Sequence, residues 1–366
     1  MSTMYRLGEL FSGPGGMALG AHAAARVVGV DLQHAWANDW DASTCATYRR
    51  NIPGASTASV VHTDVRGLDV AALSPIDGFA FGFPCNDYST VGESRGLNGE
   101  FGPLYQYGID VLNTHRPAWF VAENVTGLRS SNGGRDFELI LRSLRDAGDG
   151  YAITPHLYEF EKYGVPQRRH RIIIVGIAKS HTRTFQVPAP TTPNPSEWAT
   201  ARAALAGIPI SAKNNELTRQ SDRVVRRLRY IRPGQNAFNA VMPDDLRLNV
   251  KGATLSHIYR RLHPDRPAYT LTGSGGGGTH GYHWEAPRAL TNRERARIQT
   301  FPDEFVFEGS KESVRKQVGM AVPPLGAQAI FEALFRTMVG ESYKFIPSNL
   351  TSSGSPRDSV LIDALR

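Results

Sequence analysis

Residues 4–25 read MYRLGELFSGPGGMALGAHAAA, a stretch that predicts a strand, a tight glycine turn and a helix in direct succession. The strand is expected over residues 4–11 and the alanine-rich helix over residues 17–25. In the turn between them, Gly13, Gly15 and Ala18 match the G-x-G-x-x-A spacing, whose small residues let the backbone approach a ligand at a helix N-terminus. One such match also fits a purely structural turn, so the residues that follow decide between the two.

Acidic residues follow the next two predicted strands. Asp39 and Asp41 come after a run at residues 35–37, and Asp64 comes after another at residues 60–63. A carboxylate at the end of the second strand is well placed to bind ribose hydroxyls. The first part of the chain is therefore predicted to bind a nucleoside-containing cofactor, and this geometry alone allows an NAD-like or an S-adenosylmethionine-like one.

Strand and helix patterns keep alternating along the first half, which predicts an α/β fold with a doubly wound mixed sheet. The aromatic strand at residues 76–83 stops at Pro84, which cannot donate to a sheet ladder, and Cys85 comes next. Glu123 closes the strand at residues 118–122. Because the carboxyl ends of parallel strands share one edge, Cys85 and Glu123 are expected to face one cleft. The alternatives are a buried structural cysteine and a glutamate in a helix N-cap region.

The second half of the chain has a different composition. Residues 187–196 hold several prolines, which is typical of an extended linker. In residues 197–267 the hydrophobic residues follow neither a helix nor a strand period, and a basic segment lies at residues 223–232. A recognition module or a loop-rich insertion would have this composition. A helix is predicted over residues 291–301 with Thr291 or Asn292 as its cap, and a last amphipathic helix is predicted near residue 324.

Composition limits the classes of function. The chain has 366 residues, of which 41% are hydrophobic and 20% charged, as in globular proteins of one or two domains. No apolar run approaches the ~20 residues that span a bilayer, and two cysteines are too few for a disulfide framework or a zinc site. We therefore expect a cytoplasmic protein with no membrane association and no metal. The net charge of +7 and the arginine clusters near residues 168–171, 223–232 and 260–266 fit either a polyanionic partner or a solvated surface.

Taken in order, these motifs resemble the C5-cytosine-specific DNA methyltransferases of the bacterial restriction-modification or orphan type. The resemblance covers nearly the whole chain, and several motifs in the family's order make it specific. They are residues 11–16 (FSGPGG), 82–85 (GFPC) with Ser89, 123–125 (ENV), 167–171 (QRRHR) and 317–324 (QVGMAVPP).

The resemblance implies a domain division. It implies a Rossmann-like, S-adenosylmethionine-dependent catalytic domain over residues 1–183, completed by residues 310–345. A smaller, irregular target recognition domain with its hinge would occupy residues 184–309. Residues 346–366 would form a poorly ordered tail.

The resemblance also implies a mechanism. Cys85 would add to carbon 6 of a cytosine flipped out of the duplex, so that carbon 5 can attack the methyl group of S-adenosylmethionine. Glu123 would hydrogen-bond N3 as a protonated acid, and Arg171, with Arg169 beside it, would contact the cytosine O2 and the adjacent backbone. Residues 88–102, which contain four glycines, would close over the flipped base. The motifs do not identify the base that removes the carbon 5 proton, and a water molecule can serve.

Further contacts follow from the resemblance by position. S-adenosylmethionine, which leaves as S-adenosylhomocysteine, would be bound by Phe11, Gly13, Pro14, Gly16, Asp39, Trp40, Asp64, Val65, Pro84, Leu104 and Val322. Double-stranded DNA would be contacted by Ser89, Arg95, Gln167, Arg232 and Arg260. The expected form is a monomer acting in the cytoplasm at the nucleoid, with or without a cognate restriction endonuclease that acts independently.

Two positions depart from the family's pattern. Asn86 stands where a glutamine usually follows the cysteine, and Met320 stands where an asparagine usually follows the glycine of the last motif. Three alternatives remain open at this point: an NAD-type oxidoreductase, a related cytosine methyltransferase that acts on RNA, and a DNA-binding module that has lost catalysis.

Overall fold

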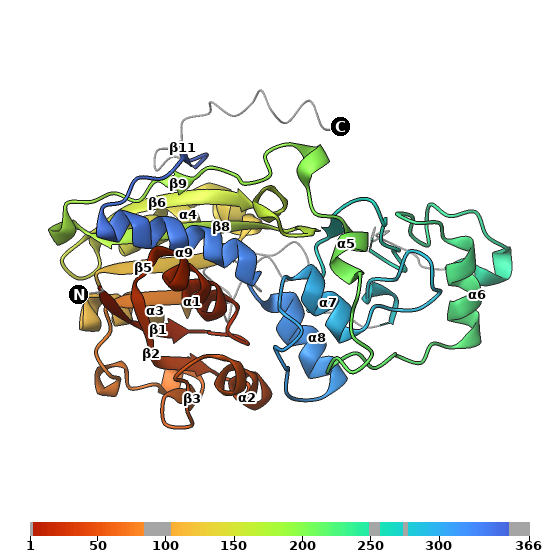
Figure 1. Cartoon of the computed structure of the whole chain (residues 1–366), viewed down its shortest axis with the longest axis horizontal. Coiled ribbons are helices and arrows are strands. Elements are labelled where there is room, and N and C mark those ends of the chain that lie inside the picture. Colours follow the sequence, from red (N-terminus) through yellow and green to blue (C-terminus); the bar gives the residue numbers. More distant parts are fainter. Residues whose placement is uncertain (1–2, 84–103, 249–256, 274–276, 351–366) are drawn as a thin grey trace.

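The main sheet has seven strands in the order β3-β2-β1-β4-β5-β8-β6 (Figure 1). All run parallel except β8, which is antiparallel to both of its neighbours. The structure is a computed structural model and describes residues 3–83, 104–248, 257–273 and 277–350. The strands are β1 (Met4–Leu10), β2 (Asp31–Asp39), β3 (Val60–His62), β4 (Gly78–Gly82), β5 (Trp119–Val125), β6 (Tyr151–Glu159) and β8 (His170–Ala178).

Helices cover both faces of this sheet, which confirms the doubly wound mixed fold. One face packs against α1 (Gly16–Val28), α2 (Ala42–Asn51) and α9 (Pro324–Val339), and the other against α3 (Tyr105–His115) and α4 (Arg135–Asp146). Side chains alternate along a strand, so each strand supplies both cores. In β5, Trp119 and Val121 belong to the first core, and Phe120 and Ala122 to the second.

The C-terminal helix α9 packs directly on the first helix. A Cβ added at Gly20 would lie 2.6 Å from both the Ala327 Cβ and the Pro324 carbonyl oxygen, so glycine permits this close approach. By length and composition alone, Lys311–Val339 could cross a membrane, but 72% of its most apolar window is buried inside the fold. That burial identifies the stretch as part of the core.

A second, irregular lobe lies beside the sheet (Figure 1). It carries α5 (Ala201–Leu205) and α6 (Asp222–Tyr230), and its hydrophobic clusters are smaller than those of the sheet domain. Helices α7 (Asn292–Ile298) and α8 (Lys311–Met320) lie next to it, and their Ala296, Val314 and Val318 belong to the first core of the sheet domain. As predicted, α7 is capped by Thr291, in a capping box with Glu294. The short strands β7 (Gln167–Arg168) and β10 (Ala268–Tyr269) pair in parallel and join the two lobes.

The proline-rich segment and the start of the tail are tied to the sheet domain. Strand β9 (Val187–Pro188) pairs with β11 (Phe345–Ile346). Beyond β11, Asn349 forms hydrogen bonds with both the backbone nitrogen and the carbonyl oxygen of Leu157 in β6. These contacts attach residues 346–350 to the sheet domain, and the rest of the predicted tail lies outside the described residues.

Candidate functional site

The glycine turn after β1 is held by Asp39 at the end of β2. The Gly13 backbone nitrogen donates to the Asp39 carboxylate at 3.0 Å, and the Asp41 backbone nitrogen donates to its other oxygen, also at 3.0 Å. Burial raises the pKa of Asp39, while these two hydrogen bonds act in the opposite direction. Phe11 opens the turn with a φ of 52°, a left-handed conformation that non-glycine residues rarely adopt and that clusters at functional sites.

The turn also touches the last motif. A Cβ on Gly16, the first residue of α1, would lie 2.2 Å from the Val322 carbonyl oxygen. The two segments, which are 306 positions apart, therefore lie backbone against backbone, and Pro14 is buried between Gly13 and Gly16. The structure thus brings together Gly13, Pro14, Gly16, Asp39 and Val322, five of the predicted cofactor residues.

Apolar side chains lie next to the glycine turn. Phe11 packs against the core cluster that contains Val65 and Leu104. Asp64 precedes Val65 and caps a short 3-10 helix by accepting from the Arg66 backbone nitrogen at 2.9 Å. Trp40 is 65% exposed, and the Lys316 ammonium of α8 lies 4.8 Å from its ring centroid. An indole left so open lies outside the hydrophobic core and is available to stack on a ligand.

The carboxyl edge of the sheet brings Glu123 and Arg171 together. The Arg171 guanidinium donates to the Glu123 carboxylate at 2.8 Å, and their side chains are only 14% and 12% exposed. Gly82, at the end of β4, pairs in register with Glu123. Cys85 itself, with Pro84, Asn86, Ser89 and Arg95, lies outside the described residues.

Asn124 belongs to the ENV motif, but the sequence assigned it no role in the site. Its side-chain nitrogen donates to the Phe83 carbonyl oxygen at 3.2 Å, and the residue is buried. This bond ties β5 to the last described residue before Pro84 and Cys85. The signal was present in the sequence as the polar residue that follows Glu123.

Gln167 and Arg169 are fully buried beneath the surface on which a DNA contact was predicted. The Gln167 amide donates to Gln299 at 2.8 Å and accepts from the Leu271 backbone nitrogen at 2.8 Å. Gln299 in turn donates to the Val318 and Ala321 carbonyl oxygens, and Arg169 donates to the Met320 carbonyl oxygen at 3.3 Å. This network connects the QRRHR segment to the last motif, and Met320 takes part through its backbone while 60% exposed.

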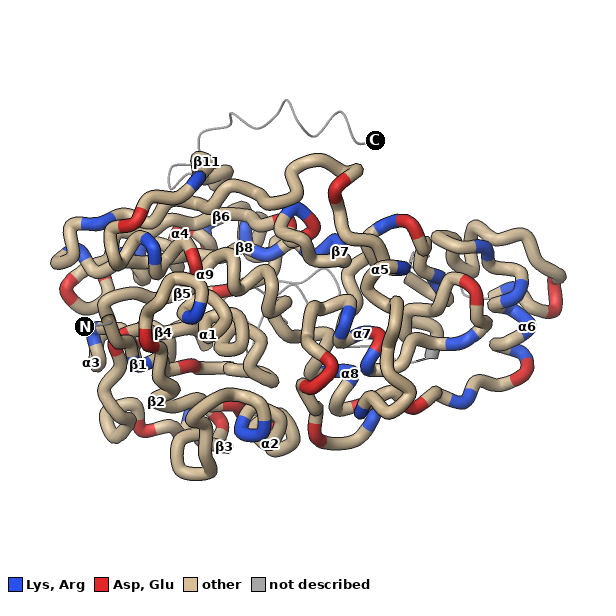
Figure 2. Tube along the Cα trace, in the orientation of Figure 1, with Lys and Arg blue, Asp and Glu red and all other residues tan. Residues whose placement is uncertain are grey.

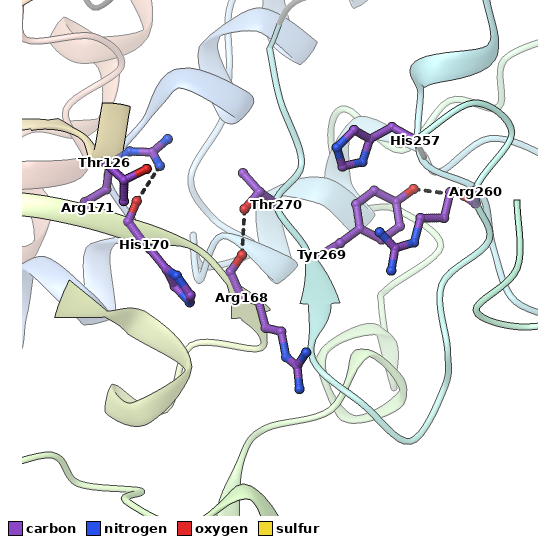
Figure 3. Close-up of a pocket in the computed structure, with 8 residues that line it drawn as sticks. All are labelled: Thr126, Arg168, His170, Arg171, His257, Arg260, Tyr269 and Thr270. Atoms are coloured by element: carbon purple, nitrogen blue, oxygen red, sulfur yellow. Dashed lines mark hydrogen bonds between the residues drawn. The ribbon is translucent and has the colours of Figure 1, made fainter. Parts of the chain in front are cut away.

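A basic pocket opens between the lobes. Its volume is about 410 Å³, and no acidic side chain among the described residues lines it (Figure 3). The Arg260 guanidinium lies 4.5 Å from the ring centroid of Tyr269, whose hydroxyl donates to the Arg260 carbonyl oxygen. The lining residues are Thr126, Arg168, His170, Arg171, His257, Arg260, Tyr269 and Thr270. Arg232 is exposed but does not line this pocket; it follows α6, a helix of the second lobe that carries several arginines (Figure 2).

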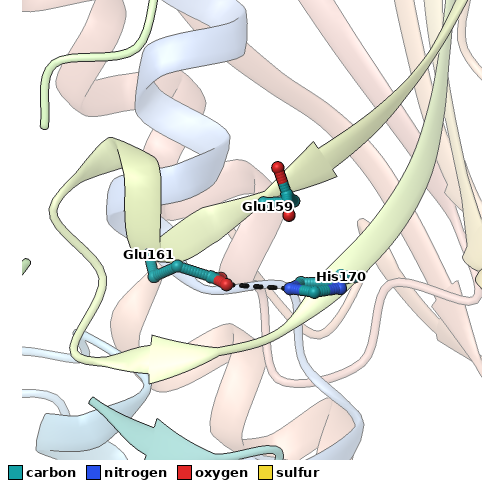
Figure 4. A group of neighbouring side chains, drawn as sticks. All are labelled: Glu159, Glu161 and His170. Carbon is teal, nitrogen blue, oxygen red and sulfur yellow. Dashed lines mark hydrogen bonds and ion pairs between the residues drawn. The ribbon is translucent and has the colours of Figure 1, made fainter. Parts of the chain in front are cut away.

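Among the described residues, one group has the composition of a metal site. Glu159, Glu161 and His170 place ligand-type atoms within 4.8 Å of one another (Figure 4). However, the Lys162 ammonium already pairs with Glu159, and the His170 ring lies 2.8 Å from a Glu161 carboxylate oxygen. Both carboxylates thus have a partner from the protein itself.

The chain matches the protein family described as C-5 cytosine-specific DNA methylase over residues 5–336. It is 56% identical to the Type II methyltransferase M.BbvI of Brevibacillus brevis, across 94% of each chain. It is 39% identical to the Type II methyltransferase M.NgoFVII of Neisseria gonorrhoeae, across 89% of this chain and 85% of the relative. The fold is similar to a prophage-encoded DNA modification methyltransferase of E. coli, with a TM-score of 0.68 at 24% identity, covering 91% of this chain and 99% of that one. The family match spans most of the chain and agrees with the predicted motifs, so this protein belongs to the C-5 cytosine-specific DNA methylases.

Proposed function

We propose that Cys85 is the nucleophile with which this enzyme methylates carbon 5 of a cytosine in a specific duplex DNA sequence. The observation that carries the proposal is the Glu123–Arg171 pair, which lies at the sheet edge next to Gly82. Cys85 follows Phe83 by two residues, and the Asn124 side chain holds the Phe83 carbonyl oxygen at that edge. A thiol, a carboxyl group and a guanidinium would then surround one base.

The Cys85 thiolate forms a bond to carbon 6, and the electron pair of the 5,6 double bond moves toward carbon 5, which attacks the methyl group. Bound S-adenosylmethionine would supply that methyl group as an electrophile and would leave as S-adenosylhomocysteine, which keeps the electron pair of the broken sulfur–methyl bond. A base then removes the carbon 5 proton, the double bond re-forms, and Cys85 leaves with the electron pair of its carbon–sulfur bond. The Cys85 thiolate and the methylated base are the result.

Glu123 and Arg171 would bind the base during these steps. In the structure Glu123 accepts a hydrogen bond from Arg171, so it must gain a proton before it can donate to the cytosine N3. We propose that the base enters between the two side chains. Arg171 would then turn to the cytosine O2, and Glu123 would donate to N3.

The cofactor would lie against the glycine turn. Its ribose would be bound by Asp39, its adenine by Trp40 and Asp64, and its apolar surroundings would be Phe11, Val65 and Leu104. Phe11 packs against the hydrophobic cluster that contains Val65 and Leu104, Asp39 accepts from the Gly13 backbone nitrogen, and Gly16 lies against the Val322 carbonyl oxygen, which supports the assignment. Pro84 is proposed on the resemblance alone.

Duplex DNA would lie across the basic pocket. Arg260 is accessible there, whereas Gln167 and Arg169 are buried and hydrogen-bonded inside the protein. We therefore propose that Gln167 and Arg169 position the last motif and the QRRHR segment. Ser89, Arg95 and Arg232 keep their proposed DNA contacts from the resemblance.

The central test compares the two cysteines. We expect Cys85→Ser to abolish methyl transfer to duplex DNA while S-adenosylhomocysteine still binds, and to lose the covalent adduct with DNA that contains 5-fluorocytosine. Cys45→Ser is the matched control, because burial raises the pKa of the Cys45 thiol to about 11 and leaves it unreactive. Retained turnover in Cys85→Ser would refute the assignment. Replacing the duplex with tRNA in the same assay tests the RNA alternative.

The remaining functional details follow from the DNA substrate. We propose a cytoplasmic enzyme that acts as a monomer at the nucleoid. The Type II names of M.BbvI and M.NgoFVII support a role in restriction-modification, in which a separate endonuclease would cut the same sequence. Sequencing of methylated DNA from a methylation-free host that expresses the chain would identify that sequence.

A further inference from the structure

His170 lies between Arg169 and Arg171 of the QRRHR segment. It begins β8, and its side chain is 41% exposed. In the basic pocket it lies with Arg168, Arg171 and Arg260, all of them cationic (Figure 3). The motif therefore brings a third basic side chain to the pocket, one to which the resemblance assigns no role.

Glu161 holds one ring nitrogen of His170. The His170 Nε2 lies 2.8 Å from the Glu161 Oε1, and the Glu161 side chain is only 3% exposed (Figure 4). The second oxygen of Glu161 is buried and has no hydrogen-bond partner among the described residues. A carboxylate that is buried in this way is stabilised most by a positively charged partner, which favours the imidazolium form of His170.

This bond decides what the other ring nitrogen can do. When Nε2–H donates to Glu161, Nδ1 of a neutral ring carries only a lone pair and repels a phosphate oxygen. Nδ1 of the imidazolium carries a proton and can donate to that oxygen. His170 can therefore bind an anion in the pocket only while it is charged.

Some groups around His170 raise the pKa of its ring, and others lower it. The hydrogen bond with Glu161 is the main cause that raises the pKa of His170, and the charges of Glu161 and Glu159 act in the same sense. Burial and the charge of Arg168 lower it. Lys162 lies behind Glu159, and Arg171, Arg260 and His257 line the rest of the pocket. A phosphate would add negative charge to this surrounding and favour the imidazolium further.

We propose that His170, held as an imidazolium by Glu161, donates Nδ1–H to a backbone phosphate of the bound DNA. The affinity for DNA then contains one phosphate contact that depends on pH. This contact rests on the proposed DNA site, and it deepens that proposal by naming a ligand of the phosphate backbone outside the family's motif residues.

The test measures how DNA affinity depends on salt and pH. A fluorescein-labelled duplex is titrated with the full chain at several salt concentrations, from about pH 6 to about pH 9. Each phosphate contact contributes about 0.9 to the slope of log Kd against log salt. We expect the wild-type slope to fall by about that amount as the pH rises through the titration of His170.

Variants separate this contact from a structural role. His170→Asn should give the smaller slope at every pH, and His170→Lys the larger slope at every pH. Glu161→Gln should move the titration to lower pH, because the ring loses its anionic partner. His181→Asn is the matched control: His181 is exposed and follows β8 at the opposite edge of the sheet, so the pH dependence should persist.

The outcomes distinguish the two proposals. A wild-type affinity that does not depend on salt would overturn the DNA site itself. A steep salt dependence that is the same at every pH, and unchanged in His170→Asn, would overturn the role of His170 alone. Thermal melting shows whether each variant is folded. If His170→Asn does not fold, the comparison of His170→Lys with the wild type still tests the role of His170.

Discussion

The contact between Gly16 and Val322 gives a sharp prediction about how the two ends of the chain form the cofactor site. Gly16→Ala would place a methyl carbon 2.2 Å from the Val322 carbonyl oxygen. A carbon and an oxygen atom that are not bonded normally stay more than 3 Å apart, so one of the two backbones must move. Since the opposing atom belongs to the backbone, it cannot rotate away as a flexible side chain would.

The magnitude follows from the size of this clash. Overpacking by a methylene group typically costs about 1–3 kcal/mol, and we expect the upper half of that range here. Urea denaturation should show a lower midpoint with an unchanged slope. Calorimetry should show weaker binding of S-adenosylhomocysteine by about tenfold or more, because a loss of 1.4 kcal/mol already corresponds to tenfold.

A matched control separates the clash from the general effect of adding a methyl group. Gly67→Ala has its nearest atom, the Thr63 Oγ1, at 3.8 Å, and it is expected to change stability by less than about 0.5 kcal/mol. If Gly16→Ala matched this control in both urea midpoint and cofactor affinity, the coupling between the turn and the last motif would be refuted.

Two further predictions concern the cofactor domain. Trp40→Ala should weaken S-adenosylhomocysteine binding by about 0.5–1.5 kcal/mol, because the stacking on the indole ring is lost. The melting temperature should stay nearly unchanged, since the ring is 65% exposed. A lower melting temperature with unaltered affinity would show instead that Trp40 stabilises the fold and does not bind the cofactor. Burial raises the pKa of Glu9 to about 8 from its usual value of 4.5, so the folded chain retains a proton that the unfolded chain loses. The unfolding free energy should therefore fall as the pH rises from about 4.5 to about 8, and urea denaturation of Glu9→Gln should show a flatter pH dependence than the wild type.

The sequence by itself determined the features that depend on local order. The strand, glycine turn and helix at residues 4–25 are neighbours along the chain, and their residue types specify them directly. The sequence also placed Glu123 and the segment leading to Cys85 at one edge, because parallel strands in a doubly wound sheet end on the same side. The capped helix α7 was predictable for the same local reason, since Thr291 precedes its first turn.

Only the tertiary structure decided which of these side chains touch. Gln167 was predicted to face DNA, yet it bonds to Gln299, 132 residues away. Gly16 meets Val322, Asn124 reaches the Phe83 carbonyl oxygen, and His170 meets Glu161 across a turn. Periodicity says on which face of a strand or helix a residue lies, but not what another segment places opposite it. The partners of the QRRHR segment are set by packing between distant segments, which no local pattern contains.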